Sequence, residues 1–240
     1  DLPPIPATFI RMGDQKEFNQ ITSTDEQWKK YLRGYFACYS FADYNIGVVL
    51  DALDKSKYAE NTIVIVTSDN GFHMGEKDRF NKNGLWEQSA ITPMAVRVPG
   101  SPHAGKICSG PVNLQDLYPT FVDLCGNGLE PLSQVDGHSF RPLLEDPDME
   151  WEHTSNTYFG KGWVSVRSAK YRYLVYPDGS EELYDHQSDP KEWTNLAGDP
   201  EYAKVKEELK THVPEAMEET LEGRWSKTLD AVMEEVASGK

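Results

Sequence analysis

The 240-residue sequence lacks any run of about 18 apolar residues, and its first ten residues, DLPPIPATFI, lack the basic and apolar regions of a signal peptide. We therefore expect no membrane insertion within these residues. Basic residues are also scarce, because 24 lysines and arginines stand against 39 aspartates and glutamates, a formal net charge of −15. No stretch concentrates the basic side chains, so nucleic acids and anionic membranes are poor partners for this surface.

Cysteine is rare as well. Cys38, Cys108 and Cys125 are too few and too widely spaced for a disulfide framework or a cysteine-rich zinc site. Hydrophobic residues make up 38% of the sequence and charged residues 26%, which is typical of a globular protein. Residues 1–22 begin Pro-rich and show no element of their own, so we expect a connector from a missing N-terminal half of a longer protein.

Residues 23–150 have the pattern of an α/β layer. Apolar positions at three- and four-residue spacing predict a helix from about residue 25 to 55. The β-branched run 62–66 has no alternation, which is typical of a central strand covered on both faces. Residues 93–98 predict a second strand, and residues 113–124 predict a second helix.

The pattern changes in residues 151–240. Two strand-like segments, 157–167 and 170–176, precede a PDGS turn and the segment EELYDH, which predicts two hairpins in a small antiparallel sheet. A helix is predicted from residue 201 to about 212, because Asp-Pro precedes a stripe of apolar residues. These elements predict a C-terminal α+β subdomain that ends in a Glu-rich surface helix.

Asp69, Asn70 and Gly71 come directly after the first predicted strand. Open α/β sheets bind ligands beyond the carboxyl ends of their strands, and Asp69 and Asn70 offer two hard oxygen ligands for Ca²⁺ or Mg²⁺. Asp-Asn-Gly is also good turn chemistry that needs no metal. Roughly 20 irregular residues follow, including Lys82, and loops of that length are usually functional or disordered. They favour a ligand site.

Five segments in order resemble the second half of the sulfatase family in the alkaline phosphatase superfamily: SDNGFHMGEK, KNGLWE, TPMAVRVPG, VNLQDLYPTFVDLCG and VRSAKYRYLVYPDGSEELYDHQSDPKEWTNLAGDP. The last one looks like the C-terminal subdomain of bacterial polysaccharide and iduronate-type sulfatases. The resemblance covers about residues 22–212. It implies part of an alkaline-phosphatase-like mixed sheet flanked by helices, a small C-terminal antiparallel sheet with a packed helix, and hydrolysis of a sulfated carbohydrate.

The resemblance also implies roles for individual residues. Asp69 and Asn70 match a pair that ligates Ca²⁺ beside the sulfate, and Lys82 matches a lysine that contacts the sulfate oxygens. His73 lies nearby and either contacts a sulfated sugar or packs in the interior. Three further residues are candidates for the rim of the substrate site: Glu76, Lys77 and Trp86.

The nucleophile of the family is a formylglycine made within a Cys/Ser-x-Pro-x-Arg motif. None of the cysteines begins this motif, and the nearest match, SGPVN at Ser109, ends in Asn. The early Asp pair, a second lysine and the histidines expected to protonate the leaving alcohol are missing too. The resemblance therefore implies that the N-terminal half of the same enzyme supplies formylglycine and further calcium ligands, and that this chain alone is inactive.

Two alternatives stay open. A phosphatase or phosphonate monoester hydrolase of the same superfamily shares the fold and differs in metal and nucleophile. A catalytically inactive fragment or binding module would use Asp69 and Asn70 only as a turn. The resemblance further implies a periplasmic or secreted location.

Overall fold

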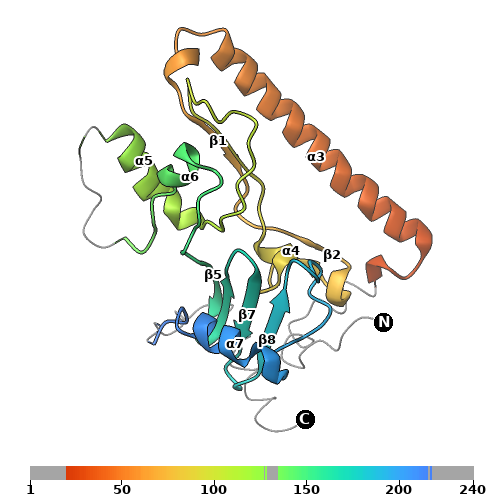
Figure 1. The fold of residues 1–240 in the computed structure, drawn as a ribbon. Helices are drawn as coiled ribbons and strands as arrows, with labels where there is room; N and C mark the ends of the chain where they lie inside the picture. Colours follow the sequence, from red (N-terminus) through yellow and green to blue (C-terminus); the bar gives the residue numbers. More distant parts are fainter. Residues whose placement is uncertain (1–19, 127, 129–134, 216, 218–240) are drawn as a thin grey trace.

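The chain forms an elongated α/β part beside a smaller part made of one sheet and its covering helix (Figure 1). The computed structural model describes residues 20–126, 128, 135–215 and 217. Most of the expected connector and most of the expected Glu-rich helix lie outside the described residues.

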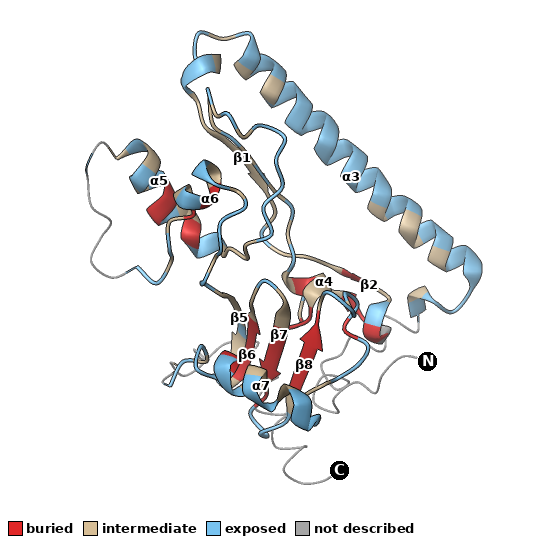
Figure 2. Cartoon of the chain, in the orientation of Figure 1, coloured by how far each residue is buried: buried red, intermediate tan, exposed pale blue. Residues whose placement is uncertain are grey.

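Helix α3, Asp25–Asp54, confirms the first predicted helix. Thr24 caps it, because its side-chain oxygen accepts a hydrogen bond from the Gln27 backbone at 3.2 Å. No residue of α3 is fully buried, and aromatic side chains such as Phe36 and Tyr39 are exposed (Figure 2). In the described part of the chain, neither α3 nor another helix is both long and apolar enough to cross a membrane.

Strands β1 (Val64–Thr67) and β4 (Met94–Arg97) form an antiparallel pair, and η1 (Ala59–Asn61) leads into β1. Both strands occur where the sequence predicts them. The expectation of a central strand covered on both faces is wrong for the described residues, because β1 pairs there with β4 alone and is only half-buried. The apolar sequence of a strand indicates that it tends to be buried. It does not show which other segments pack against it.

The second predicted helix consists of η3 (Leu114–Asp116) and α5 (Leu117–Cys125), and α6 (Arg141–Glu145) packs against α5. The buried carboxylate of Asp116 accepts hydrogen bonds from the backbone N–H groups of Asn113 at 2.7 Å and His138 at 2.9 Å. This carboxylate ties the start of the helix to a segment 22 residues further along the chain.

The C-terminal part is the predicted antiparallel sheet with a packed helix. Its four strands pair in chain order: β5 (Ser155–Gly160), β6 (Trp163–Arg167), β7 (Tyr171–Val175) and β8 (Glu181–Asp185). The prediction of one strand-like segment over 157–167 is wrong, because a turn at residues 161–162, where Gly162 has a positive φ of 78°, divides it into β5 and β6. Asp199 caps the following η4 (Pro200–Tyr202), which continues into α7 (Ala203–Lys210). The predicted boundary after residue 150 falls between α6 and β5.

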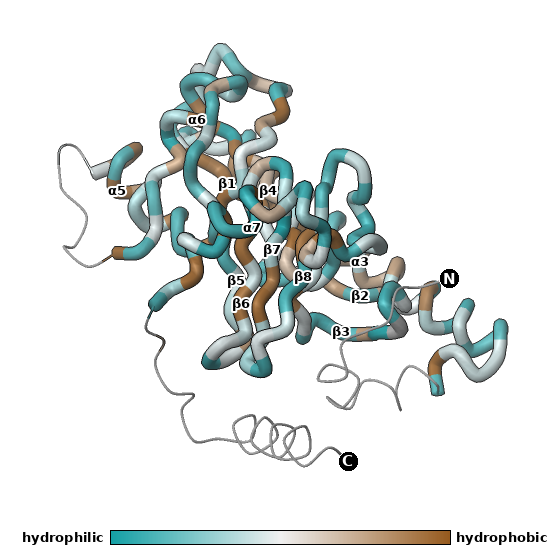
Figure 3. Tube along the Cα trace, turned by 60° about the horizontal axis from the view of Figure 1, so that its bottom comes forward, coloured by the Kyte–Doolittle hydropathy of each residue, from teal (hydrophilic) through white to brown (hydrophobic). Residues whose placement is uncertain are grey.

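This sheet is buried on both faces, and hydrophobic residues gather along its strands (Figure 3). On one face Leu209 of α7 packs against Val164, Val166, Tyr173 and Leu183. The long connection between β1 and β4, residues 68–93, is called the excursion. On the other face of the sheet its Leu85 and Trp86 pack against Trp163, Leu174, Tyr176 and Tyr184. The excursion thus covers one of the two faces of the sheet. This packing joins the two parts of the chain.

Candidate functional site

The excursion between β1 and β4, residues 68–93, contains every site residue that the sequence predicts. It includes four short elements: β2 (His73–Met74), η2 (Glu76–Asp78), β3 (Phe80–Asn81) and α4 (Glu87–Ala90). Strands β2 and β3 pair with each other, so the excursion has a hairpin-like tip.

Asp69, Asn70 and Lys82 line one cleft of about 1180 Å³ between the β1–β4 pair and the C-terminal sheet. Lys82 Nζ lies 4.0 Å from Asp69 Oδ2, and the two side chains are 52% and 82% exposed. Residues from opposite sides of the excursion therefore meet, and the three residues with predicted roles at the sulfate lie together.

The chain bends at Asp69, and Asp69 and Asn70 line the cleft. Ser68 Oγ donates to the Asn70 carbonyl at 3.0 Å, and the Gly71 N–H donates to the Ser89 carbonyl at 2.9 Å. A Cβ on Gly71 would lie 2.1 Å from the carbonyl oxygen of Gln88, so the backbones approach too closely for a larger residue. This bend is compatible with the ligand interpretation.

The donor set at this bend fits Ca²⁺ in kind. A side-chain carboxylate from Asp69 and an amide oxygen from Asn70 are hard oxygen ligands, and both residues line the cleft. Calcium takes about six to eight oxygens, so these two make up a minority of a complete shell. The ammonium of Lys82 is placed beside them, where it suits an anion adjacent to the cation.

His73 and Trp86 lie in the interior, 0% and 1% exposed, with their rings edge to face at a centroid distance of 6.1 Å. Burial lowers the pKa of His73 to about 3, and the charge of Arg79 acts in the same direction, so the imidazole is neutral near pH 7. For His73 the structure favours the packing interpretation. The expectation that Trp86 contacts substrate does not fit its burial against the C-terminal sheet.

Lys77, predicted at the rim, is instead 3% exposed. Its Nζ donates to the carbonyl oxygen of Glu192 at 2.5 Å and lies 5.0 Å from the ring centres of both Trp86 and Tyr184. Burial lowers the pKa of Lys77, although nearby carboxylates oppose this effect. Glu76 is exposed, and its carboxylate accepts a hydrogen bond from the Met74 backbone at 2.6 Å. Of these two, only Glu76 lies at the surface.

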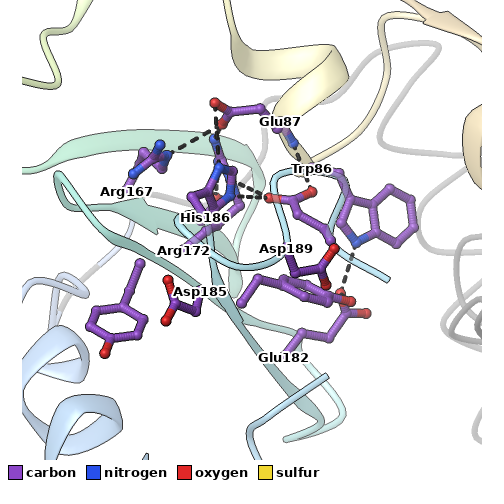
Figure 4. Close-up of polar contacts among 12 residues, drawn as sticks. Trp86, Glu87, Arg167, Arg172, Glu182, Asp185, His186 and Asp189 are labelled. Atoms are coloured by element: carbon purple, nitrogen blue, oxygen red, sulfur yellow. Dashed lines mark hydrogen bonds and ion pairs between the residues drawn. The ribbon is translucent and has the colours of Figure 1, made fainter. Parts of the chain in front are cut away.

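The sequence did not indicate an ion-pair network that joins the excursion to the C-terminal sheet (Figure 4). The guanidinium of Arg172 contacts the carboxylate of Glu87, and its Nε lies 2.8 Å from Glu192 Oε1. His186 Nε2 lies 2.9 Å from the same oxygen, and Arg167 Nε lies 3.4 Å from Glu87 Oε2. Glu87 is 80 and 85 residues from Arg167 and Arg172, so no local sequence motif could have revealed these pairs.

Glu87, His186 and Glu192 have ligand atoms within 4.8 Å of one another, a spacing that a metal ion could bridge. Burial alone would raise the pKa of Glu87, but Arg172 and Arg167 outweigh it, and the pKa lies below its ordinary value. The two carboxylates are therefore balanced by two guanidinium groups. A divalent cation would be repelled by both arginines, so the cluster is an ion-pair network.

Comparison with known proteins gives two overlapping family matches. Residues 11–127 match the family described as Sulfatase, and residues 75–219 match N-sulphoglucosamine sulphohydrolase, C-terminal. A protein of Formosa agariphila named Sulfatase is 36% identical over 216 residues, covering 89% of this chain and 42% of the relative. An N-acetylglucosamine-6-O-sulfatase of Bacteroides thetaiotaomicron is 33% identical, covering 83% of this chain and 37% of the relative.

A solved structure of a protein in complex with its substrate, D-glucosamine-2-N,6-O-disulfate, superposes with a TM-score of 0.68 and 31% identity. The match covers 77% of this chain and 40% of the solved one. The chain thus spans less than half the length of these three relatives, and it shares the fold of the solved one over most of its own length.

Proposed function

This chain belongs to the sulfatase family, and we propose that its protein hydrolyses the sulfate ester of a sulfated carbohydrate. The observation that carries the proposal is the meeting of Asp69, Asn70 and Lys82 in one cleft. The carbohydrate class is supported by the names of two relatives, one a sulfatase of N-acetylglucosamine and one bound to a disulfated glucosamine.

Lys82 has the chemistry for the sulfate group. As the S–O bond breaks, its electron pair goes to the leaving ester oxygen of the sulfate group, and a compact ammonium with three donors stabilises the negative charge that grows there. Asp69 and Asn70 would hold Ca²⁺, which supplies further positive charge beside the sulfate when it is bound. Lys82 would therefore lie beside the cation, and both positive charges would favour the same anionic group.

The proposed nucleophile is a formylglycine that these 240 residues do not supply, because they contain no Cys/Ser-x-Pro-x-Arg motif. The chain spans 42% of the Formosa relative, which leaves room for that motif elsewhere in the same protein. We therefore infer that other residues of the protein provide the nucleophile, the remaining calcium ligands and the general acid, and that this chain by itself is inactive. A periplasmic or secreted location is part of the same proposal.

Replacing Lys82 by alanine in the native protein tests the proposal. We expect kcat/KM on an aryl sulfate to fall by about 10² to 10³, the effect of removing one donor to a developing oxyanion. Lys55→Ala is the matched control, because Lys55 pairs with Asp51 on the surface of α3. An unchanged rate in Lys82→Ala would refute its role at the sulfate.

The same assays separate the alternatives. Turnover of an aryl phosphonate or phosphate monoester without turnover of the sulfate would favour a phosphonate hydrolase or a phosphatase. A native protein that hydrolyses none of these esters would favour a binding module.

A further inference from the structure

We propose that Glu192, a residue of the C-terminal part, is a positioning residue for Lys82 and so determines how well the cleft holds a sulfate group. This inference rests on the proposed function, since it concerns the lysine assigned to the sulfate. It extends that function to a residue that lies in the interior, is 0% exposed, and does not line the cleft itself.

Lys82 has little packing of its own. Its side chain is 52% exposed, and its backbone N–H is satisfied locally by the side chain of Asn81 at 2.8 Å. Asn81 adopts a left-handed conformation with φ 96°, so the chain turns sharply just before Lys82. The position of Lys82 must therefore be fixed by the segments that precede and follow it.

The preceding segment is held by Lys77. The Lys77 ammonium is buried and donates to the backbone carbonyl of Glu192 at 2.5 Å, between the rings of Trp86 and Tyr184. The next turn is closed by Arg79, which donates to the Asn83 carbonyl at 2.7 Å, directly beyond Lys82.

The following segment is held by Glu87 and its neighbours. The Glu87 backbone N–H donates to Glu192 Oε2 at 2.9 Å. Arg172 donates to the Leu85 carbonyl at 3.2 Å and also pairs with the Glu192 carboxylate. Glu192 thus contacts the chain before and after Lys82 in the sequence, at Lys77 through its carbonyl and at Glu87 through its carboxylate.

Both carboxylate oxygens of Glu192 are committed to donors. Oε2 accepts from the Glu87 backbone, and Oε1 lies 2.9 Å from His186 Nε2 and 2.8 Å from the charged guanidinium of Arg172. In a Glu192→Gln variant the amide keeps its bond to the Glu87 N–H only by turning its NH₂ toward the guanidinium of Arg172, and the charge that balances Arg172 is lost. The segment from Leu85 to Glu87 then loosens, and Lys82 moves with it.

The experiment is a double-mutant cycle in the native protein, with kcat and KM on an aryl sulfate and inhibition by inorganic sulfate as readouts. We expect Glu192→Gln to lower kcat/KM by roughly 10- to 100-fold, the scale of a displacement of about 1 Å, and to weaken sulfate inhibition. In a Lys82→Ala background the same change should cause no further loss. A purely structural role would lower activity equally in both backgrounds.

Glu181→Gln is the matched control, because Glu181 lies on β8 but pairs with Lys206 at 2.8 Å, on the side of α7. It should leave both readouts unchanged. If Glu192→Gln does not fold, Glu192→Asp replaces it in the cycle, since it keeps the charge and shortens the reach to Glu87.

Two results would overturn the inference. Wild-type kinetics in the Glu192 variant, or an equal loss with and without Lys82, would show that Glu192 does not act through Lys82 and would leave the proposed function intact. An unaltered rate and sulfate affinity in Lys82→Ala alone would reject the role of Lys82, and the inference with it.

Discussion

The ammonium of Lys82 lies 4.0 Å from the carboxylate of Asp69, with both side chains open to the cleft. An ion pair this exposed contributes little to stability, because water and salt screen it. The pair matters because it places a carboxylate oxygen, which suits a cation, beside an ammonium nitrogen, which suits an anion. A calcium ion and a sulfate group bound as neighbours would replace the pairing of these two side chains with each other.

Asp69→Ala should weaken calcium binding by the native protein. The carboxylate is the charged member of the pair, and its loss should exceed the roughly 10- to 100-fold loss that follows from removing a group that only orients a metal ligand. Calorimetric titration with Ca²⁺ measures this affinity, and Asp51→Ala on α3 is the control. Equal affinity in wild type and Asp69→Ala would remove Asp69 from the metal site.

Gly71→Ala should destabilise the protein and impair the cleft at the same time. The new Cβ would lie 2.1 Å from the Gln88 carbonyl and 2.7 Å from the Ile91 carbonyl, so the segment with Asp69 and Asn70 must shift away from α4. Gly34→Ala is the control with opposite sign, because it lies in α3 with nothing within 4 Å of its Cβ and should stabilise by about 0.5–1 kcal/mol. Urea unfolding compares the two, and equal stability in both variants would argue against the close approach at Gly71.

Because His73 is buried, we expect the free energy of unfolding to fall in mild acid. Its folded pKa of about 3 is below the ordinary 6.5, so the unfolded chain binds the extra proton. Above pH 6.5 His73 is neutral in both states and does not lower the free energy of unfolding. As the pH falls from 6.5 toward 3, His73 lowers that free energy by about 1.4 kcal/mol for each pH unit. His73→Phe should flatten the dependence of the unfolding free energy on pH over that range, measured by urea unfolding at several pH values.

The control for this prediction is His212→Phe, since the residue is exposed and should leave the pH dependence as in wild type. A His73→Phe protein that loses stability with pH as steeply as wild type would show that His73 is not the group responsible.

Trp86→Phe should weaken the packing of the excursion against the C-terminal sheet. The indole Nε1 donates to Glu182 Oε2 at 2.7 Å, and its loss leaves a buried carboxylate with one donor fewer. We expect the free energy of unfolding to fall by about 1–3 kcal/mol. Trp193→Phe, with a residue that is 48% exposed, should change it by less than about 0.5 kcal/mol, and a similar loss in both variants would contradict the interpretation.

Local patterns predicted most of the secondary structure. Helix α3, strands β1 and β4, helix α5, strands β7 and β8, and α7 all occur where apolar spacing, caps and turns indicate them, whereas the turn between β5 and β6 was missed. These signals are local, because a cap or an apolar stripe depends on residues three or four apart. The environment of β1 was not predictable, because it depends on a partner strand beyond the local pattern.

The candidate site divides in the same way. The chemical groups of the site can be read from the sequence: the oxygens of Asp69 and Asn70, the ammonium of Lys82, the glycine at position 71, and the lack of the nucleophile motif in these residues. Which of the neighbouring side chains face the cleft depends on the fold. It buried His73, Lys77 and Trp86 and joined Glu87 to Arg172 and Glu192, because the C-terminal sheet needed an apolar cover and each buried charge needed a partner from a distant part of the chain.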